Sequence, residues 1–593
     1  MTTSLPRVPW QITGNHWVTL PCIHPGDASI HSIGLVHAQS RGAIEFAGGS
    51  DYIDGGEPPL VSISITRDGK KQRLGAAGIA WEREAGWIPS FSCRIADLAV
   101  RGVVCAPHGR DADLAGFVIQ ITVENRGTNA IDIVIGADGS FGRRFLRVRT
   151  AREFDSESEV VLSDNESIVL QGSAARDPVA IAIGAGTRGC AVAASGDRWT
   201  IDQTASIPAG VSRTVSFCIA AGQERDGAEA VLEVMRRRGA DSLIEGTRSA
   251  LLAMEPSTGN AAADRLIGRH VFFAYFCCVA RAIDDAHLYV MRSRIPWSSY
   301  GVTIRDWDAL MWIMPAVQLV DSNLAREVLL RICDLHGYAP GSGVHYLDGS
   351  LFEPGFSLEG AAAFPIAVDE YIVQSGDDKV VEEPLLADSL YNAAEDIEAR
   401  KHKTFPLYST EVNADGSIPD FSYTAHANAV VALGLDILKH TLDEKTAEKV
   451  QDAAAVRAAL LRQFTQTDSS GKSILAQSSD FENAAQGTGV SSAALYWLPY
   501  YDLLGRDDSL YRRTIKPLEN LETDALFVWC ARLVGPNGSR ALEWLRRAPL
   551  NGGLAAELVE DDGRAKANGG DAALSGLIGY TAWYAVHAMG VTL

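Results

Sequence analysis

The chain has 593 residues, of which 47% are hydrophobic and 21% are charged, and it contains 55 glycines and 23 prolines. This length predicts two or three domains, and this composition excludes a disordered, collagen-like or coiled-coil chain. The 74 acidic residues outnumber the 53 lysines and arginines, which gives a net charge of −21. Because an acidic body repels phosphate backbones and anionic lipids, we expect no nucleic-acid or membrane partner and a small or neutral ligand instead.

Nine cysteines are scattered through the chain without a CxxC motif, and most of them lie in apolar runs such as 272–280. This pattern predicts buried free thiols in a reducing compartment rather than disulfides or a zinc site. Residues 1–6 lack the basic and apolar regions of a signal peptide, and the most apolar stretch, 271–280, is too short to span a bilayer. We therefore expect a cytoplasmic protein.

Residues 1–224 are predicted to form an antiparallel β-sandwich domain. Apolar and polar residues alternate with a period of two at 61–66 and 119–124, and less regularly at 211–217. Turn-forming residues such as Asp68-Gly69 close these runs. Short strands separated by turns, with almost no helical stretch between them, are typical of a sandwich.

The period of the hydrophobic pattern becomes helical after residue 225. Residues 225–258 predict a linker helix, and residues 259–593 contain about twelve helix-like segments. Twelve segments make six hairpins, which predicts an (α/α)6 barrel, a closed double ring of inner and outer helices. Because alternate loops are long and rich in Trp, Tyr, Asp and Gly, we expect them to build a pocket at one end of the barrel. The segments are 260–284, 307–319, 322–336, 358–375, 381–399, 424–440, 446–465, 492–504, 508–518, 523–535, 539–548 and 571–590.

The segment 295–315, IPWSSYGVTIRDWDALMWIMP, carries the most informative set of side chains. Flat aromatic faces suit the C–H surfaces of sugars, and carboxylates with arginine suit the hydroxyl groups. An aspartate at a helix start can also be a simple N-cap that stabilises the helix by about 1 kcal/mol, and this alternative stays open for either aspartate. The aromatic and charged residues of the segment are Trp297, Tyr300, Arg305, Asp306, Trp307, Asp308 and Trp312.

A second cluster of carboxylates, at 552–563, precedes the last predicted helix. Glu557 follows an apolar run, whereas Glu560, Asp561 and Asp562 form a charge block typical of an exposed turn. Cleavage of a glycosidic bond needs one protonated acid and one carboxylate that handles water or the anomeric carbon. Since the first and last hairpins of a closed ring are neighbours, we expect the loops near 306 and 557 to face each other.

The run RDWDALMWIMP at 305–315 resembles the acid-bearing segment of glycoside hydrolases with an (α/α)6 barrel. These include the glycogen-debranching amylo-α-1,6-glucosidases, glycoside hydrolase family 63 and the glucoamylase-like group, which the order of sandwich and barrel also resembles. By this resemblance Asp308 is the general acid, with Asp306 in reserve, and Glu557 is the general base, with Glu560 in reserve. The resemblance implies an inverting hydrolase that acts on an oligosaccharide or a small α-glucoside.

Further aromatic and polar residues are predicted to line a sugar-binding pocket, although core packing is the alternative for each aromatic one. No HExxH motif or local set of His and Asp ligands occurs, and the glycine-rich segments lack the context of a phosphate loop, so we expect neither a metal nor a cofactor. The predicted sugar-binding residues are Trp297, Tyr300, Arg305, Trp307, Trp312, His345, Glu359, Tyr423, His426, Trp497 and Trp583.

Three other functions stay open. Tyr423, His426 and Asn428 are residue types that polysaccharide lyases use for β-elimination, although the acidic chain is a poor match for their anionic substrates. A glycoside phosphorylase would use inorganic phosphate in place of water. A non-catalytic carbohydrate-binding protein would need the aromatic residues and not the carboxylates.

Overall fold

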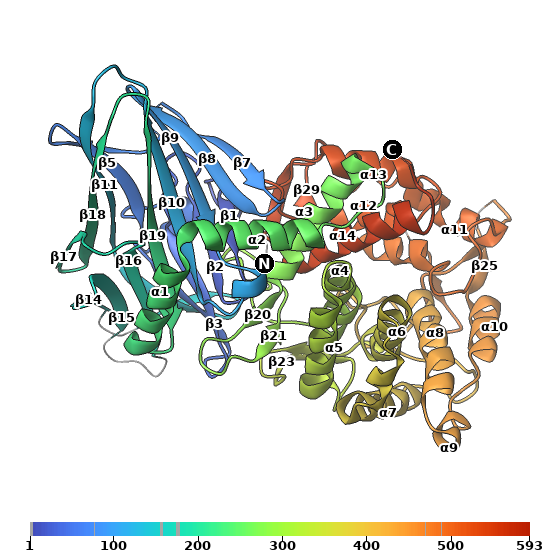
Figure 1. Ribbon diagram of the computed structural model, residues 1–593. Helices are drawn as coiled ribbons and strands as arrows, with labels where there is room; N and C mark the ends of the chain where they lie inside the picture. Colours follow the sequence, from blue (N-terminus) through green and yellow to red (C-terminus); the bar gives the residue numbers. More distant parts are fainter. Residues whose placement is uncertain are drawn as a thin grey trace.

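The structure is a computed structural model that describes residues 4–592 apart from 76, 155–157, 173–177, 469 and 488. Strands make up the part of the chain up to Gly222, and helices dominate the part that follows (Figure 1). The predicted class, an antiparallel β domain followed by a helical barrel, is confirmed. Strand β19 ends at Gly222 and helix α1 begins at Arg225, so the predicted division at 224/225 falls between them.

Three antiparallel sheets form the N-terminal part. The eight-stranded sheet has the order β14-β15-β16-β19-β10-β9-β8-β7, the five-stranded sheet β17-β18-β11-β5-β6, and the six-stranded sheet β1-β2-β3-β4-β12-β13. The strands are β1 (Gln11–Gly14), β2 (Val18–Ile23), β3 (Ser32–His37), β4 (Gly42–Ala47), β5 (Ser62–Arg67), β6 (Lys70–Arg73), β7 (Ala80–Glu84), β8 (Ile88–Ile95), β9 (Leu98–Cys105), β10 (Gly116–Asn125), β11 (Ile131–Ser140), β12 (Arg143–Arg147), β13 (Ala151–Glu153), β14 (Ser158–Ser163), β15 (Ser167–Gly172), β16 (Ala180–Ala185), β17 (Ala191–Ser195), β18 (Arg198–Ile207) and β19 (Ser212–Gly222).

The period-two alternation seen in the sequence places one face of each strand in a common core. Ile119 and Ile121 of β10 point into this core, and Ile133 and Ile135 of β11 reach it from a different sheet. All four side chains are buried, so the alternation correctly identified the inner face.

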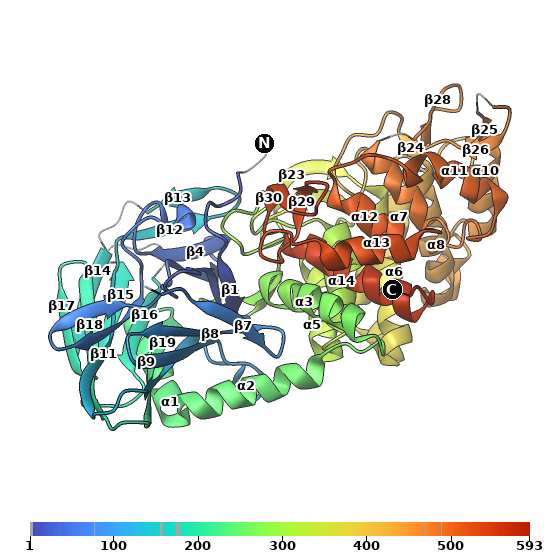
Figure 2. The ribbon, with the colours of Figure 1, turned by 90° about the horizontal axis from the view of Figure 1, so that it is seen from above.

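Two helices, and not the single predicted one, connect the sheets to the barrel. Helix α1 (Arg225–Arg238) and helix α2 (Ala240–Met254) meet at Gly239, whose φ of 78° is incompatible with a continuing α-helix. Leu232 and Met235 of α1 are buried, and α1 packs against β16 and β19. Figure 2 shows the two helices running one after the other from the sheets toward the barrel.

In the described part of the chain, the barrel has an inner and an outer ring of helices. The inner segments contact one another in a closed circuit, in which the last one, α14, also packs against the π-helical turn η3 and against α12. The inner ring consists of η3 (Asp308–Ile313) with α4 (Met314–Gln318), α6 (Leu358–Ser375), α8 (Ala425–Thr441), the 3-10 helix η5 (Val490–Trp497), α12 (Leu526–Leu533) and α14 (Ala572–His587). The outer ring consists of α3 (Ala261–Cys277), α5 (Ser322–His336), α7 (Pro384–Glu398), α10 (Ala453–Phe464), α11 (Ser509–Glu519) and α13 (Gly538–Arg547).

The remaining helices and strands of the described chain, in the barrel and among the N-terminal strands, are short. They comprise the helix α9 (Glu444–Ala447), the 3-10 turns η1 (Tyr52–Asp54), η2 (Gly109–Asp111) and η4 (Asp378–Glu382), and the strands β20 (Val279–Arg281), β21 (Leu288–Val290), β22 (Ser342–His345), β23 (Leu351–Phe356), β24 (Tyr423–Thr424), β25 (Thr465–Thr467), β26 (Ser473–Leu475), β27 (Ser478–Ser479), β28 (Ala484–Ala485), β29 (Ala556–Val559) and β30 (Ala565–Gly569).

Side-chain caps start the inner helices where the sequence turns from loop to apolar run. Ser357, Thr424 and Asp571 each accept a hydrogen bond from a backbone N–H in the first turn of α6, α8 and α14. Such a cap stabilises a helix end by about 1 kcal/mol. The caps fix where each inner helix begins, and with it the position of the loop that precedes the helix.

The six-stranded sheet supports the loops that precede η3 and α6. The backbone N–H of Val302 donates to the carbonyl of Val148, which directly follows β12. Arg149 donates to the Thr303 hydroxyl at 3.1 Å and to the Glu353 carboxylate at 2.7 Å. The sheets therefore hold two of the barrel loops in place.

The nine cysteines are free thiols as expected, and all except the half-exposed Cys190 are buried. Among the described residues, no helix combines the length and the apolar character that crossing a membrane requires.

Candidate active site

A buried arginine that the sequence did not single out organises the end of the barrel where the inner helices begin. Arg292 lies two residues after β21, and its side chain is 4% exposed. Its Nη1 donates to Asp308 Oδ2 at 2.8 Å, its Nη2 donates to Asp571 Oδ2 at 2.8 Å, and the same Nη2 lies 3.6 Å from Glu557 Oε1. The guanidinium also lies over the ring of Tyr300, 3.9 Å from its centroid. A buried charge is tolerated because it is paired and hydrogen-bonded in this way.

Asp308, the predicted general acid, lies at the start of the π-helical turn η3 and is 1% exposed. Burial raises the pKa of its carboxyl group, and the neighbouring Arg292 and Arg305 oppose that rise. Asp308 is ion-paired to Arg292 and lines neither of the cavities described below. A proton donor must reach the leaving oxygen of the substrate, and a side chain that is only 1% exposed presents little surface to it.

Glu557, the predicted general base, lies on β29, and its side chain is 25% exposed. Its Oε1 accepts a 2.6 Å hydrogen bond from the Tyr300 hydroxyl, and its Oε2 accepts one of 2.8 Å from Nδ2 of Asn568 on β30. The two loops that we expected to face each other therefore do so. Both carboxylate oxygens are held, and the group stays partly open to solvent.

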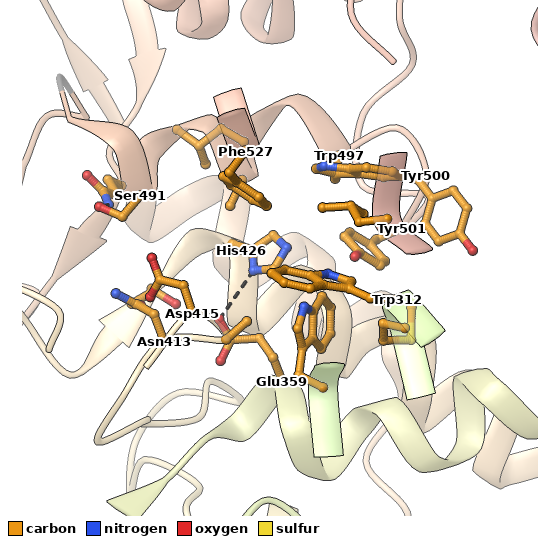
Figure 3. A pocket seen from close by; sticks show the side chains of 18 of the residues that line it. Trp312, Glu359, Asn413, Asp415, His426, Ser491, Trp497, Tyr500, Tyr501 and Phe527 are labelled. Atoms are coloured by element: carbon orange, nitrogen blue, oxygen red, sulfur yellow. Dashed lines mark hydrogen bonds and ion pairs between the residues drawn. The ribbon is translucent and has the colours of Figure 1, made fainter. Parts of the chain in front are cut away.

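A cavity of about 810 Å³, a volume that includes the solvent at its open mouth, lies at the same end of the barrel. Glu359 is a buried residue of its lining, and its Oε1 lies 3.2 Å from His426 Nδ1 (Figure 3). Figure 3 shows Asn413 and Asp415 on one side of the cavity and Trp497, Tyr500 and Tyr501 on the other. The lining residues are Trp307, Met311, Trp312, Glu359, Asn413, Ala414, Asp415, Thr424, His426, Gln477, Ser491, Ala494, Leu495, Trp497, Tyr500, Tyr501, Phe527, Leu577 and Tyr580.

A second cavity, of about 470 Å³, shares a wall with the first because Trp307 and Ala414 line both. Arg305 and Asp306 lie in it, together with backbone at Gly341 and Gly343. The charged residues near Glu557 adjoin both cavities, because Arg305 lines the second one and Arg292 lies beside Trp312 of the first. Arg292 lies 5.1 Å from the ring centroid of Trp312, a residue of the first cavity, and Arg305 lies 5.6 Å from that of Tyr300.

Asp306 is fixed by a cluster of buried side chains that the sequence pattern did not reveal. Its Oδ1 lies 2.7 Å from His336 Nδ1, and its Oδ2 accepts a hydrogen bond from the Gly341 N–H. The Nε2 of His345 lies 3.9 Å from Asp306 Oδ1, so the fold does gather one Asp and two His. The two imidazole rings stack with centroids 4.1 Å apart and planes 19° apart. The arrangement is that of a hydrogen-bonded cluster.

Several predicted residues line neither the first nor the second cavity, and the predicted base Glu557, Tyr300 and His345 are among them. Trp297 is 5% exposed and packs beside Gly569 and Gly570. Trp583 stacks on His587 with ring centroids 4.9 Å apart. Glu560, the reserve base, is exposed in the turn between β29 and β30, as expected for a solvated acidic turn.

The lyase interpretation loses two of its three residues. Tyr423 packs against His402 and Phe481 and lines neither cavity. Asn428 is fully buried, and its side chain bonds the backbone of Tyr408. His426 remains in the first cavity, where it faces Glu359.

Sequence reasoning missed Asp415, Gln477 and Phe527, which line the first cavity. Asp415 Oδ1 accepts hydrogen bonds from the N–H and the hydroxyl of Ser417, so the segment reads as an ordinary Asx turn. One feature of the sequence did point to Asp415, namely its position in the long loop that precedes the inner helix α8. The residues that were predicted and do lie in a cavity are Arg305, Asp306, Trp307, Trp312, Glu359, His426 and Trp497.

Comparison with known proteins agrees with the fold described above. No family model matches the chain, and no curated protein matches it in sequence. It is similar to a bacterial glucoamylase solved in complex with acarbose, with a TM-score of 0.62 and 11% identity over 100% of this chain and 95% of that one. It is also similar to a putative kojibiose phosphorylase from the human microbiome, with a TM-score of 0.53 and 11% identity over 93% of this chain and 87% of that one. The expected likeness to the glucoamylase-like group is thus confirmed at the level of the fold.

Proposed function

We propose that this chain, which shares the fold of a glucoamylase and of a kojibiose phosphorylase, hydrolyses the glycosidic bond of a short neutral α-glucoside with inversion at the anomeric carbon. The observation that carries the proposal is the Glu557 carboxylate, which is partly exposed and held by Tyr300 and Asn568. A carboxylate fixed in this way is suited to take a proton from water as that water attacks the anomeric carbon.

The character of the first cavity supports a neutral sugar as the substrate. Trp307, Trp312 and Trp497 offer apolar faces, and Glu359 with Gln477 offers groups that hydrogen-bond hydroxyls. The net charge of −21 disfavours anionic substrates. The assignment to an α-glucoside rests on the likeness to the glucoamylase, whose structure holds acarbose.

We assign the proton-donating role to Asp415 and no longer to Asp308. Asp415 lines the first cavity, while Asp308 is buried and ion-paired to Arg292. Ser417 fixes Asp415 Oδ1 with two hydrogen bonds. In the proposed step the bond between the anomeric carbon and the glycosidic oxygen breaks, and the Asp415 carboxyl group gives its proton to that leaving oxygen. The water oxygen bonds to the anomeric carbon from the opposite side, and Glu557 accepts the proton of that water.

Phosphorolysis is the second candidate, because one of the similar structures named above is a putative phosphorylase. In a phosphorylase the phosphate is itself the nucleophile, so no base is needed. Here three carboxylates, Glu557, Asp308 and Asp571, outnumber the two arginines beside them, Arg292 and Arg305, and the remaining negative charge repels a phosphate dianion. The geometry therefore favours water.

Proton NMR of the anomeric signals during turnover tests the proposal. The protein is mixed with α-linked and β-linked gluco-disaccharides and trisaccharides, with and without inorganic phosphate. We expect the β-anomer of glucose to appear first from an α-linked substrate, at a rate independent of phosphate. An α-anomer as the first product would contradict inversion, and a sugar 1-phosphate formed only with phosphate would establish the phosphorylase.

Matched variants connect the activity to the site. Glu557→Gln is expected to lower kcat/KM about 10²- to 10⁴-fold, which is the usual contribution of a general base. Glu560→Gln, in the exposed turn of the same hairpin, is the control and should keep the wild-type rate. Equal activity of Glu557→Gln and the wild type would remove Glu557 from the mechanism.

A further inference from the structure

Arg292 contacts three carboxylates of the site, and only one of them, Glu557, has a role in the proposed reaction. Its guanidinium donates to Asp308 and Asp571 at 2.8 Å and lies 3.6 Å from Glu557. Asp571 also caps α14 through a 3.1 Å hydrogen bond from the Leu574 N–H, so its position is fixed by the helix. Arg292 therefore connects the loop after β21, the turn η3, the hairpin β29–β30 and the start of α14.

Both cations and carboxylates surround Glu557, and the balance between them sets how strongly Arg292 attracts the Glu557 carboxylate. Arg292 approaches Glu557 directly, and Arg305 lies 3.8 Å from Asp308 in the same cluster. Asp308 and Asp571 share Arg292 and partly neutralise it. How strongly Arg292 acts on Glu557 therefore depends on whether its two other partners are charged.

Other groups near Glu557 do not replace this cation. The Tyr300 hydroxyl and the Asn568 amide donate hydrogen bonds and carry no charge. Lys566, on the same hairpin, is exposed and paired with Asp524 at 3.0 Å. The exposed Glu560, in the turn of this hairpin, carries a like charge.

We propose that Arg292 is a positioning residue that orients the Glu557 carboxylate and attracts its negative charge, and that Asp308 acts as the counter-ion that moderates Arg292. This inference rests on the proposed function, in which Glu557 activates water. It gives Asp308 a role that suits a buried, ion-paired carboxylate.

The inference predicts opposite shifts for two charge changes. Asp308→Asn keeps the shape and removes one negative charge, so Arg292 attracts the Glu557 carboxylate more strongly. Arg292→Gln removes the positive charge that attracts this carboxylate. The acidic limb of the pH profile of kcat/KM reports the ionisation of the base in the free enzyme. We expect the limb to move down by about 1 pH unit in Asp308→Asn and up by about 1 to 2 units in Arg292→Gln.

Two further variants keep the test decisive if Arg292→Gln does not fold. Asp571→Asn retains a residue type that caps helices and should move the limb in the same direction as Asp308→Asn. Arg292→Lys keeps the charge and loses the forked hydrogen bonds, so it should lower kcat with a small effect on the limb. Added guanidinium should restore part of the turnover of Arg292→Gln and none of that of Glu557→Gln.

The outcomes separate this inference from the proposed function. Loss of turnover in a folded Asp308→Asn variant at every pH would make Asp308 the proton donor and overturn the inference, as would an unmoved limb. If the wild type cleaves no glycoside, the proposed function fails, and an infrared titration still decides the charge coupling. The carboxylate band that Glu557→Gln removes should titrate at a lower pH in Asp308→Asn than in the wild type, and an unchanged titration would refute the coupling.

Discussion

The Tyr300 hydroxyl donates a 2.6 Å hydrogen bond to Oε1 of Glu557, although 257 residues separate the two along the chain. Burial, together with the neighbouring Glu557, raises the pKa of Tyr300. The phenol therefore stays protonated and keeps donating wherever the site is functional. A hydrogen bond to a charged acceptor both orients the acceptor and favours its ionised form.

Tyr300→Phe should lower kcat/KM about tenfold to hundredfold, because a hydrogen bond to a charged group contributes about 1.5 to 3 kcal/mol. The acidic limb of the pH profile should move to higher pH, since the ionised form of Glu557 loses a donor. Steady-state kinetics across pH 4 to 8 measures both effects. Tyr338→Phe is the control, because Tyr338 is 65% exposed and lines neither cavity. Wild-type kinetics for Tyr300→Phe would show that this bond has no role in catalysis.

Asp415→Asn should affect substrates according to their leaving groups. When a glucosyl disaccharide is cleaved, the leaving sugar oxygen needs a proton. When a nitrophenyl glucoside is cleaved, nitrophenolate departs as a stable anion and needs none. We expect a loss of about 10² or more in kcat/KM on the disaccharide and a much smaller loss on the nitrophenyl glucoside. Asp420→Asn, an exposed position in the same loop, is the control. Equal losses on both substrates would assign Asp415 to binding, and the same comparison with Glu359→Gln would then examine the other carboxylate of the cavity.

The architecture followed from the sequence because burial on one face imposes a period on each element. The alternation at 61–66 and 119–124 located β5 and β10, and the change to a helical period after 225 located the barrel. Gly239 broke the predicted linker helix in two because its backbone conformation is not helical. The hydrophobic pattern predicts which face of a helix or strand is buried, and it does not predict every point at which a helix is interrupted.

The site followed from the sequence where its residues lie within one segment or at the expected junction of two loops. Tyr300 and Glu557 meet as the closed ring requires. The ion pairs of Asp308 could not be predicted, because its partner Arg292 lies outside the motif and the other carboxylate on Arg292, Asp571, lies 279 residues from Arg292. Burial of a carboxylate depends on such distant partners, so Asp308 and the accessible Asp415 were not distinguishable from sequence.

Close packing between α14 and η3 depends on the missing side chain of Gly576. A Cβ at this position would lie 2.6 Å from the Trp312 carbonyl oxygen, so the helix would have to move away. Gly576→Ala should lower the free energy of unfolding by about 1 to 3 kcal/mol and weaken activity, because Trp312 lines the cavity. Gly246→Ala is the control in the exposed part of α2, where a Cβ meets nothing within 4 Å, and it should stabilise by about 1 kcal/mol. Denaturant unfolding of both variants measures the difference, and equal stability of Gly576→Ala and the wild type would contradict the close approach.

Glu370 of α6 gives the molecule a pH-dependent stability that is separate from catalysis. Burial and the neighbouring Asp369 raise the pKa of its carboxyl group to about 8, and the Tyr580 hydroxyl, at 3.5 Å, opposes the rise. Because the folded-state pKa lies above the unfolded one, the native state binds a proton that the unfolded chain has lost between about pH 4.5 and 8. Stability therefore falls as the pH rises through this window, by up to about 1.4 kcal/mol for each unit between the two pKa values.

Glu370→Gln imitates the protonated group and cannot ionise, so it should resemble the wild type in stability near pH 4.5. The variant should become progressively more stable than the wild type up to about pH 8, where the difference levels off because the folded-state carboxyl group is then ionised as well. Denaturant unfolding at pH 5, 7 and 9 measures the difference. In the structure the buried Oε2 of Glu370 has no hydrogen-bond partner. A stability difference that is constant with pH would show that Glu370 is already ionised in the folded protein near pH 5, and that Oε2 gains a partner that stabilises the charge.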